Sequence, residues 1–392
     1  MEGDFIKINE WLLPLSWLYG LGVQFRNFLF DVGILKSHTF KVPVISVGNI
    51  TVGGTGKTPH VEYLIRILQD KMRIAVVSRG YKRKSSRFVM ANADTPVSMI
   101  GDEPYQIKQK FPNITIAVDN NRCRAIEELT CNVQEDKSVD AILLDDAFQH
   151  RHVKPGINIL LVDYHRLILY DKLLPAGRLR EPMKGKNRAD IVIVTKCPKE
   201  LKPMEFRVIT KAMSLFPYQK LYFSTIEYEQ LRPVFPKECH TEDVLQLDTR
   251  NVLLLTGIAS PRQMEEDLRP HVKSLMPMAF TDHHDFKQKD IKKLNETFEA
   301  MSSPKLIITT EKDVTRLANK ESLSEEVRRH LYVMPIRINF MQDQEESFNQ
   351  YILGYVRKNS SNSILAKPKD DIKPQNSYNT GNRPRTISFR NN

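Results

Sequence analysis

The chain has 392 residues, of which 41% are hydrophobic and 27% charged, so it can bury a large core, and its length favours two domains over one. Its four cysteines form no CxxC pair and have no histidine at zinc-finger spacing, which argues against a disulfide framework or a structural zinc site and favours a reducing compartment. The net charge of +11 includes +6 from residues 357–392, so the remaining chain is only mildly basic and a nucleic-acid partner is not expected.

The first segment, residues 8–35, is rich in tryptophan, phenylalanine and leucine but is interrupted by proline, glycine and charged residues. A spanning helix needs ~20 consecutive apolar residues, and a signal peptide needs a basic start and a small-residue cleavage site, so neither is expected. Two interpretations remain. The segment is either a helix in the lipid headgroup layer, with Lys7 and Arg26 near lipid phosphates, or a helix packed on the protein core.

From residue 42 onward, short β-branched runs alternate with helical patterns. This alternation is typical of an α/β fold, a P-loop NTPase-like, doubly wound and mostly parallel sheet with helices on its faces. Helices such as 60–69 and 121–129 are expected between the strands. The expected strands are 42–47, 74–78, 115–118, 141–145, 157–162 and 191–195.

A second, smaller α/β lobe is predicted from a later series of runs. This series has expected strands at 221–227, 252–256, 306–310 and 332–336 and expected helices at 261–268 and 290–301, of which 221–227 falls in the P-loop core. The proline-bearing stretch 231–236 suggests the joint between the lobes. The tail is rich in Asn, Ser, Lys and Pro and should be disordered. The expected division is an N-terminal helix at 1–38, a P-loop core at 39–228, a smaller lobe at 229–356 and a basic tail at 357–392.

The strongest motif is a glycine-rich turn between an apolar strand and a helix. Its glycines let backbone N–H groups converge on phosphate oxygens, while Lys57 neutralises the β and γ phosphates and Thr58 offers a hydroxyl to Mg²⁺. The full P-loop pattern has a glycine at the position of Thr51, so the match is to the GGxGKT core alone. The alternative is a chance glycine loop, which the strand before it and the helix after it disfavour. The expected nucleotide-binding residues are Thr51, Val52, Gly53, Gly54, Thr55, Gly56, Lys57 and Thr58.

A pair of acids ends the apolar strand 141–145. P-loop sites use a carboxylate at the end of a neighbouring strand to hold Mg²⁺, and Asp145 and Asp146 occupy such a position. Two acids that merely cap a strand end are the alternative, but the interval from the phosphate loop favours the metal role. The predicted metal ligands are Thr58, Asp145 and Asp146.

Other polar segments are less decisive. Residues 192–196 and 307–313 both end an apolar strand in polar residues, where open α/β sheets bind ligands, so either could touch a nucleotide base or be an ordinary loop. Phosphoryl transfer to a hydroxyl also needs a proton acceptor, for which Asp or an Asp–His pair is suitable. The loops 101–104, 149–152 and 281–285 supply candidates that spacing alone does not rank.

In combination, these motifs resemble one family, the tetraacyldisaccharide 4'-kinases. The resemblance extends from the N-terminal helix to about residue 340, and the order of its motifs is more specific than any one of them. The matching stretches are 47–59, 78–81, 101–104, 145–151, 175–182, 282–286 and 310–313.

The resemblance implies an ATP- and Mg²⁺-dependent kinase of lipid A biosynthesis, whose acceptor is the 4' hydroxyl of an acylated diglucosamine 1-phosphate. It implies Asp102 as the catalytic base, His283 of the second lobe as its partner, and Lys57 as the phosphate-binding catalytic lysine. A base and a partner on different lobes would meet only when the lobes close, which excludes water. The residues implied in substrate binding are Arg79, Gln149, His150, Arg178 and Glu181.

An acceptor with several acyl chains stays in a bilayer, so the resemblance favours the membrane-surface interpretation of residues 1–38. The expected location is peripheral, on the cytoplasmic face of the bacterial inner membrane. The expected partners are the lipid substrate and the membrane surface; no nucleic acid and no obligate protein partner are implied.

Two other functions compete with this one. A regulatory or targeting P-loop NTPase would use Thr195-Lys196 in guanine recognition and prefer GTP. The guanine-binding motif needs an Asp after the lysine, where this chain has Cys197 and Pro198. The sequence also has no Cys or His cluster that would carry a metal. A kinase of a soluble sugar or nucleoside would have no use for the aromatic N-terminal segment. Lipid dependence separates the second rival from the lipid kinase.

Overall fold

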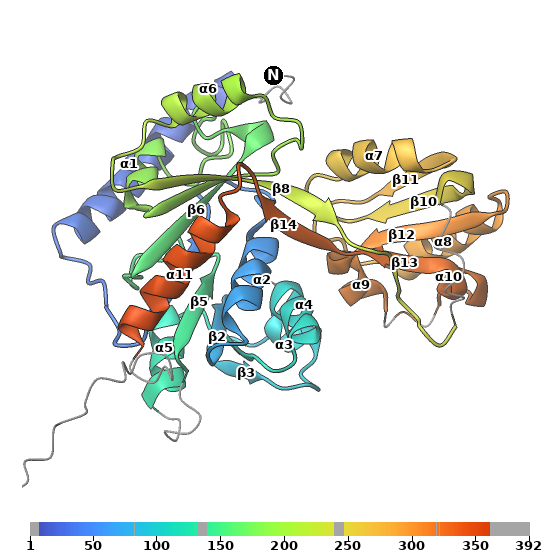
Figure 1. The fold of residues 1–392 in the computed structure, drawn as a ribbon, viewed down its shortest axis with the longest axis horizontal. Helices are drawn as coiled ribbons and strands as arrows, with labels where there is room; N and C mark the ends of the chain where they lie inside the picture. The colour runs from blue at the N-terminus through green and yellow to red at the C-terminus, as the bar shows by residue number, and fades with distance from the viewer. Residues whose placement is uncertain are drawn as a thin grey trace, which may run out of the picture.

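The computed structural model describes residues 8–81, 83–131, 139–238, 247–318, 320 and 322–360, which form two lobes (Figure 1). In the first lobe a nine-stranded sheet forms the centre. Its strands are β1 (Val44–Gly48), β2 (Ile74–Ser78), β3 (Val89–Ala91), β4 (Thr115–Val118), β5 (Ala141–Asp145), β6 (Ile157–Asp163), β7 (Ile191–Thr195), β8 (Lys220–Tyr228) and β14 (Ile336–Phe340).

The strand order is β14-β8-β7-β6-β1-β5-β2-β4-β3, and the pairs are parallel except β14–β8 and β3–β4 at the two edges. The expected doubly wound, mostly parallel sheet is confirmed. β1 has β5 on one side and β6 on the other, so the winding direction reverses at β1. Open α/β sheets bind ligands beyond the carboxyl end of the strands at such a reversal, and here that end leads into the glycine-rich loop.

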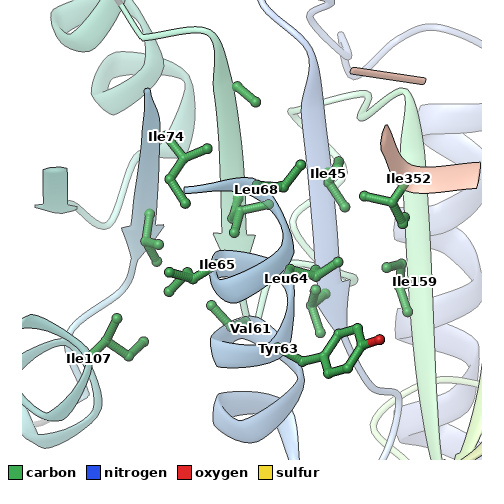
Figure 2. Packing of buried hydrophobic residues seen from close by; sticks show 14 of the residues in the cluster. Ile45, Val61, Tyr63, Leu64, Ile65, Leu68, Ile74, Ile107, Ile159 and Ile352 are labelled. Carbon is green, nitrogen blue, oxygen red and sulfur yellow. The ribbon is translucent and has the colours of Figure 1, made fainter. Parts of the chain in front are cut away.

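Helices cover the first sheet, and α2 packs most deeply against it. Val61, Leu64, Ile65 and Leu68 of α2 are almost fully buried and face the strands that carry Ile45 and Ile74 (Figure 2). This apolar stripe determines which face of α2 packs on the sheet, and the helix begins directly after Gly56 of the glycine-rich turn. The helices of this lobe are α1 (Leu13–Asp31), α2 (Lys57–Leu68), α3 (Val97–Ile100), α4 (Asp102–Lys110), α5 (Arg122–Cys131), α6 (Pro203–Met213) and α11 (Glu345–Asn359), with 3-10 turns at Glu10–Leu12, Tyr164–Arg166 and Met183–Arg188.

The second lobe is built on a five-stranded sheet with the order β11-β10-β12-β13-β9. Phe286, Leu294 and Phe298 fill its core from one face. Its strands are β9 (Arg232–Pro233), β10 (Asn251–Thr256), β11 (Ser274–Ala279), β12 (Lys305–Thr310) and β13 (Leu331–Met334). Its helices are α7 (Arg262–Leu268), α8 (Gln288–Glu299), α9 (Glu311–Leu317) and α10 (Glu325–His330), with 3-10 turns at Leu247–Thr249 and Arg269–His271.

The lobes are joined by an antiparallel pair of strands: β8 leads out of the first lobe and β14 leads back (Figure 1). The expected strand 332–336 is therefore wrong, because Pro335, which has no N–H to donate to a ladder, separates β13 from β14. The expected boundary at 229–356 also differs from the structure. β14 and α11 belong to the first sheet, where Phe348 and Ile352 are buried beside its strands.

The helix α11 continues through Asn359, past the expected start of the basic tail at residue 357. Its last turn carries Arg357 and Lys358, a favourable place for cations at a helix C-terminus. The prediction of disorder falls mainly on residues 361–392, which lie outside the described residues.

The N-terminal helix α1 lies on the outside of the first lobe (Figure 1). Most of its large apolar side chains are exposed, whereas Ser16, Gly20 and Phe30 are buried. Two hydrogen bonds also hold the helix: Ser16 Oγ donates to the Leu173 oxygen at 3.0 Å, and the Tyr19 hydroxyl donates to the Arg180 oxygen at 2.9 Å. In the described part of the chain no helix is both long and apolar enough to cross a membrane, and Lys7 lies outside that part. The exposed apolar residues are Trp11, Leu15, Trp17, Leu18, Leu21, Phe25, Phe28, Val32 and Ile34.

Candidate active site

The glycine-rich loop follows β1 and ends at the first turn of α2. Gly53 and Gly56 have φ angles of +116° and +81°, in the region that side chains with a Cβ rarely adopt, so glycine is needed at both. Asn49 donates from Nδ2 to Thr55 Oγ1 at 2.8 Å and supports the loop from within. The free N–H groups at the start of α2 and the ammonium of Lys57 make this turn suitable for phosphate.

The segment Thr195-Lys196 buttresses this loop. Thr195 Oγ1 donates to the Thr55 oxygen at 3.1 Å, and Lys196 Nζ donates both to the Gly54 oxygen and to Asp163 Oδ2, the latter at 2.7 Å. The sequence left this segment as either a contact for the nucleotide base or an ordinary loop. Its hydrogen bonds indicate a structural role, because they hold the carbonyl groups of Gly54 and Thr55.

Thr51 and Val52 are set apart from the other expected nucleotide-binding residues. The Val52 N–H donates to the Arg178 oxygen at 2.8 Å, and Thr51 forms a β-bridge with Leu179. Residues 54–58 line the cleft between the lobes, whereas neither Thr51 nor Val52 is among its lining residues. The first two residues of the loop therefore contact the 178–180 segment.

Asp145 ends β5 beside the start of the loop, because it pairs in register with Val47 of β1. Its pKa is raised to about 7, first by burial and then by the nearby carboxylates of Glu103 and Asp146, against the opposing effect of Lys57. Ser78 Oγ donates to Oδ2 at 3.3 Å, while Oδ1 is buried with no hydrogen-bond partner among the described residues. A buried acid with an unused oxygen is suited to a cation.

Asp146 differs from its neighbour in charge state. Burial acts to raise its pKa, but Lys57 and Arg180 outweigh burial and hold it below its usual range. The carboxylate lies 3.8 Å from Lys57 Nζ and 3.3 Å from Arg180 Nη2, and Arg180 also donates to Asn49 Oδ1. The main chain at Asp146 has a positive φ of 45°, a strained conformation of the kind that clusters at functional sites.

These two carboxylates and the Thr58 hydroxyl fit Mg²⁺ as an oxygen-donor set. In the described ranges no three His, Cys, Asp or Glu side chains gather as a metal-binding group. A set of two carboxylates is consistent with Mg²⁺, which is usually held by one or two carboxylates together with water and substrate phosphates.

Asp102 and His283 meet across the lobe interface, as the resemblance implied. Asp102 begins α4 after Gly101, and His283 lies in the loop after β11 with its Nδ1 3.3 Å from Asp102 Oδ2. Burial acts to raise the pKa of Asp102, but the hydrogen bond from His283 and the charge of Arg316 lower it to about 2. The carboxyl is therefore ionised throughout the physiological range.

Two cations around this pair were not predicted as site residues. Arg316 of α9 donates to Asp102 Oδ2 from Nη2 at 2.6 Å and from Nε at 3.0 Å. Lys312 of α9 lies 3.0 Å from Asp282 Oδ1 and 3.1 Å from His283 Nε2. Lys312 stands inside a recognised motif, 310–313, but Arg316 lies beyond it and its partner is 214 positions away in the chain.

Two of the residues expected to bind the acceptor, Arg79 and His150, lie near Arg26 of α1. His150 is partly buried, and its pKa falls to about 4 because burial disfavours the imidazolium and Arg122, His152, Arg26 and Arg79 add positive charge. This is a concentration of cationic groups on one side of the phosphate loop. It suits an anionic substituent of an acceptor.

The other three expected acceptor residues differ in their surroundings. Arg178 is exposed beside the loop, and the main-chain oxygen of Gln149 accepts from Arg26 Nη2 at 3.4 Å. Glu181 is 1% exposed and pairs with Arg188 at 2.7 Å. Its side chain thus faces the adjacent 3-10 turn, and a direct contact with the acceptor would require that pair to open.

The cleft between the lobes has one charged wall and one apolar wall. The charged wall comprises the phosphate loop with Lys57, Glu103, Lys196 and Lys312. On the other side Tyr228 is fixed by its hydroxyl, which donates to Asp267 Oδ2 at 2.8 Å. The apolar lining residues are Ile226, Tyr228, Ile258, Ala259, Met264, Met334 and Ile336.

Known proteins match this chain over nearly its whole length. The sequence model of the family described as tetraacyldisaccharide-1-P 4'-kinase matches residues 8–357. The tetraacyldisaccharide 4'-kinase of Phocaeicola vulgatus is 56% identical over 365 residues, covering 93% of this chain and 99% of that protein. The enzyme of the same name from Bacteroides fragilis is 52% identical over 375 residues, and that from Porphyromonas gingivalis is 44% identical over 359 residues, with 94% and 90% of this chain covered and 99% of each relative.

A solved structure shares the fold. The crystal structure of LpxK from Aquifex aeolicus in complex with ATP superposes with a TM-score of 0.65 at 30% identity, covering 88% of this chain and 98% of that one. The match extends across both lobes, so the two-lobe arrangement around the cleft is common to both proteins.

Proposed function

The chain belongs to the tetraacyldisaccharide-1-P 4'-kinase family, and we propose that its inter-lobe cleft transfers the γ-phosphate of ATP to the 4' hydroxyl of an acylated diglucosamine 1-phosphate. The observation that carries this proposal is the meeting of Asp102 and His283, 3.3 Å apart, beside a cleft that is also lined by the phosphate loop. A base from one lobe and its partner from the other suit a kinase that reacts when closed.

ATP is proposed to bind with its phosphates on the loop residues 53–58. The convergent N–H groups and the Lys57 ammonium favour the β and γ phosphates. The adenine base is proposed to lie against the apolar wall, where Tyr228 and Met264 offer flat and polarisable surface. We propose ATP as the donor because the 30% identical LpxK structure was solved in complex with ATP. Beside its apolar residues, the cleft also offers polar side chains to the edge of the base, among them Ser260 and Gln263.

Asp145, Asp146 and Thr58 are the proposed Mg²⁺ ligands. When bound, Mg²⁺ would neutralise charge on the phosphates and polarise the transferred group. The unused oxygen of Asp145 and its raised pKa support this assignment, because a cation would relieve the cost of ionising that buried acid. Lys57 and Arg180 keep Asp146 ionised for the same purpose.

Asp102 is the proposed base. A bond forms between the 4' oxygen and the γ phosphorus, the bond from that phosphorus to the β–γ bridging oxygen breaks, ADP leaves, and the hydroxyl proton passes to Asp102. The weak basicity of Asp102 is compatible with a loose transition state, in which positioning and charge stabilisation contribute more than early proton removal. The protein must therefore hold the Asp102 carboxylate in the correct position next to the acceptor hydroxyl.

The acceptor is proposed to approach from a membrane on which α1 rests. The helix turns its tryptophans, leucines and phenylalanines to solvent, an arrangement suited to the headgroup layer. Arg26 of α1, Arg79 and Arg122 surround His150, and these three arginines are proposed to receive the acceptor's phosphate, with the neutral imidazole of His150 between them. On these grounds the protein is proposed to act peripherally at the cytoplasmic face of the inner membrane.

The test is transfer of label from γ-labelled ATP to tetraacyldisaccharide 1-phosphate in mixed micelles with Mg²⁺, with GTP and the Asp102→Ala protein in parallel. Label in the lipid from ATP and wild-type protein only is the expected result. Nucleotide hydrolysis without lipid label, or a preference for GTP, would favour a regulatory NTPase. Label in a soluble sugar or nucleoside at a similar rate would favour the second rival.

A further inference from the structure

Two helices from different lobes, α4 and α9, are joined by charge pairs at both of their ends. Asp102, the first residue of α4, pairs with Arg316 in the last turn of α9. Lys110, the last residue of α4, pairs at 2.7 Å with Glu311, the first residue of α9. The helices therefore run antiparallel, and one end of this link is the proposed base itself.

The hydrogen bonds to Asp102 are distributed unequally between its two oxygens. Nε and Nη2 of Arg316 and Nδ1 of His283 all approach Oδ2, at 3.0, 2.6 and 3.3 Å. Among the described residues no side chain or main-chain group forms a hydrogen bond with Oδ1. One oxygen is anchored and the other is left available for an acceptor hydroxyl.

Arg316 is itself held by a buried acid. Its side chain is 7% exposed, and Nη1 lies 3.4 Å from Oδ1 of Asp313, which is fully buried. Asp313 Oδ2 accepts from the Gly257 N–H at 2.9 Å and from Thr310 Oγ1 at 2.7 Å. Gly257 directly follows β10 and Thr310 ends β12, so the guanidinium is oriented by groups at the ends of two strands.

His283 has a cation at each of its ring nitrogens. Lys312 Nζ lies 3.1 Å from Nε2, and Arg316 Nη2 lies 3.2 Å from Nδ1, the nitrogen that also faces Asp102 Oδ2. Arg316 therefore contacts both members of the Asp102–His283 pair. Among the described residues, the charged and titratable groups around Asp102 and His283 include Arg316, Lys312 and Asp282 from the second lobe. Glu103 and Tyr81 come from the first lobe, and the Tyr81 ring lies 4.9 Å from the ring of His283.

From these contacts we infer that Arg316 is a positioning residue, which holds Oδ2 of Asp102 in a two-point guanidinium contact and thereby presents Oδ1 to the acceptor hydroxyl. The inference rests on the proposed function, in which Asp102 receives the hydroxyl proton. It adds to that function a residue of the second lobe that no sequence motif predicted. Because Arg316 comes from the opposite lobe, the base is oriented only when α9 lies against α4.

Arginine suits this role better than lysine. Its planar fork sends two donors to one carboxylate from a fixed direction, whereas a lysine ammonium is a point charge on a flexible stem. The cation also keeps Asp102 ionised, since burial alone would raise the pKa of that carboxyl. Loss of the guanidinium should therefore disturb both the orientation and the protonation of the base.

The second charge pair supplies a matched control. Lys110 contacts Glu311 and also the buried Glu62 of α2 at 2.7 Å, but it touches neither Asp102 nor His283. Lys110→Gln weakens the contact between α4 and α9 and leaves the hydrogen-bond partners of Asp102 in place. Arg329→Ala, which breaks an exposed Arg329–Glu325 pair on α10, controls for the loss of an arginine.

The experiment compares Arg316→Lys, Arg316→Gln, Lys110→Gln and Arg329→Ala in the full chain. For each we would measure kcat and both KM values from pH 4 to 9, and the Kd of a non-hydrolysable ATP analogue by calorimetry. Retained analogue binding shows that the variant is folded. Arg316→Gln is expected to lower kcat about 100-fold, as for a misplaced catalytic group. The pKa of Asp102 is about 2, so the wild-type acid limb lies below the measured range. In Arg316→Gln this limb should move upward by ~2 to 3 pH units, so that kcat falls toward pH 4 in the variant and not in wild type.

Arg316→Lys should keep the acid limb near its wild-type position while kcat stays reduced, because it restores charge but not the fork. Lys110→Gln is expected to leave the acid limb unmoved, and Arg329→Ala should match wild type throughout. The inference is overturned if Arg316→Gln binds the analogue normally and keeps wild-type kcat and acid limb, or if Lys110→Gln reproduces its full phenotype. Absence of lipid phosphorylation by the wild-type protein would instead refute the proposed function.

Discussion

Asp145 of β5 pairs in register with Val47 of β1, and this pairing sets a fully buried carboxylate beside the phosphate loop. The strand order that puts β5 next to β1 is thus the origin of the proposed metal site. The loop and the acid lie about one hundred positions apart in the sequence. They come together because the parallel sheet places the carboxyl ends of β1 and β5 side by side.

Lys57→Ala should reduce phosphate transfer at least ~100-fold, as expected when a preorganised charge is removed from the transferred group. Lys57 lies 3.8 Å from Asp146 at the start of α2, where no other lysine of that helix can replace it. The measurement is single-turnover transfer at saturating ATP. Lys71→Ala, an exposed lysine after α2, is the control. Full activity of Lys57→Ala would remove this lysine from the site.

Asp145→Asn should have opposite effects on stability and activity. The pKa of Asp145 is raised to about 7, so at pH 8 the metal-free protein carries an unfavourable buried charge. We expect the amide to raise the urea midpoint at pH 8 without divalent cations and to lower Mg²⁺-dependent transfer at least ~100-fold. A wild-type dependence of transfer on Mg²⁺ concentration in the variant would contradict the assignment of this ligand.

His60 should make stability depend on pH. It is fully buried, with Nδ1 2.7 Å from the Gly56 oxygen and Nε2 3.1 Å from Ser224 Oγ. Burial lowers its pKa to about 4, from the 6.5 of an ordinary histidine, although the bond to Gly56 opposes the change. Between those values the unfolded chain binds a proton that the folded chain does not, so the stabilisation is present above pH 6.5 and lost as the pH falls to about 4.

From this group alone we expect the free energy of unfolding to fall by ~2 kcal/mol between pH 7 and pH 5. Urea titrations at the two pH values measure the fall. His60→Gln should show a smaller difference between pH 7 and pH 5 than wild type, whatever its absolute stability. His271→Gln, at an exposed site, should keep the wild-type difference. An unchanged difference in His60→Gln would show that other groups dominate.

Replacing the exposed face of α1 should weaken membrane association. Trp17, Leu18 and Leu21 are 71%, 68% and 65% exposed, and burying each in lipid would contribute ~1.5 to 3 kcal/mol. The triple glutamine variant should cosediment with anionic vesicles at least ~100-fold more weakly. Met276→Gln, an exposed apolar residue of the second lobe, is the control. Unaltered sedimentation would place the anchor elsewhere.

The sequence was sufficient for the features whose causes are local. The β-branched runs identified the central strands, because a parallel strand buried on both faces must be apolar throughout. The glycines at 53 and 56 identified the loop, because only glycine tolerates its φ angles. Asp145 was singled out from the sequence because it ends the apolar run 141–145.

Features that depend on long-range pairing were missed. The return of β14 to the first sheet rests on its pairing with β8, more than one hundred residues earlier, and no local pattern distinguishes it from a strand of the second lobe. Arg316 was missed because an arginine on a short helix reads as solvated charge until its partner, Asp102, is known. The packing of α1 was also missed. Ser16, Tyr19 and the buried Phe30 hold the helix while most of its apolar side chains stay exposed, which departs from the usual rule that a helix buries its apolar face.

The ribbon of β8 and β14 has a consequence for how the chain is made. β8 leaves the ribosome with one edge unpaired, and the strand that covers it, together with α11, is synthesised only after the whole second lobe. The second lobe is therefore an insertion that can complete its own sheet first, while the larger lobe waits with an open edge of the kind prone to wrong pairing. Tyr228 and Ile336 face each other where the insertion begins and ends, so a short turn joining them would yield the larger lobe as a separate, continuous protein.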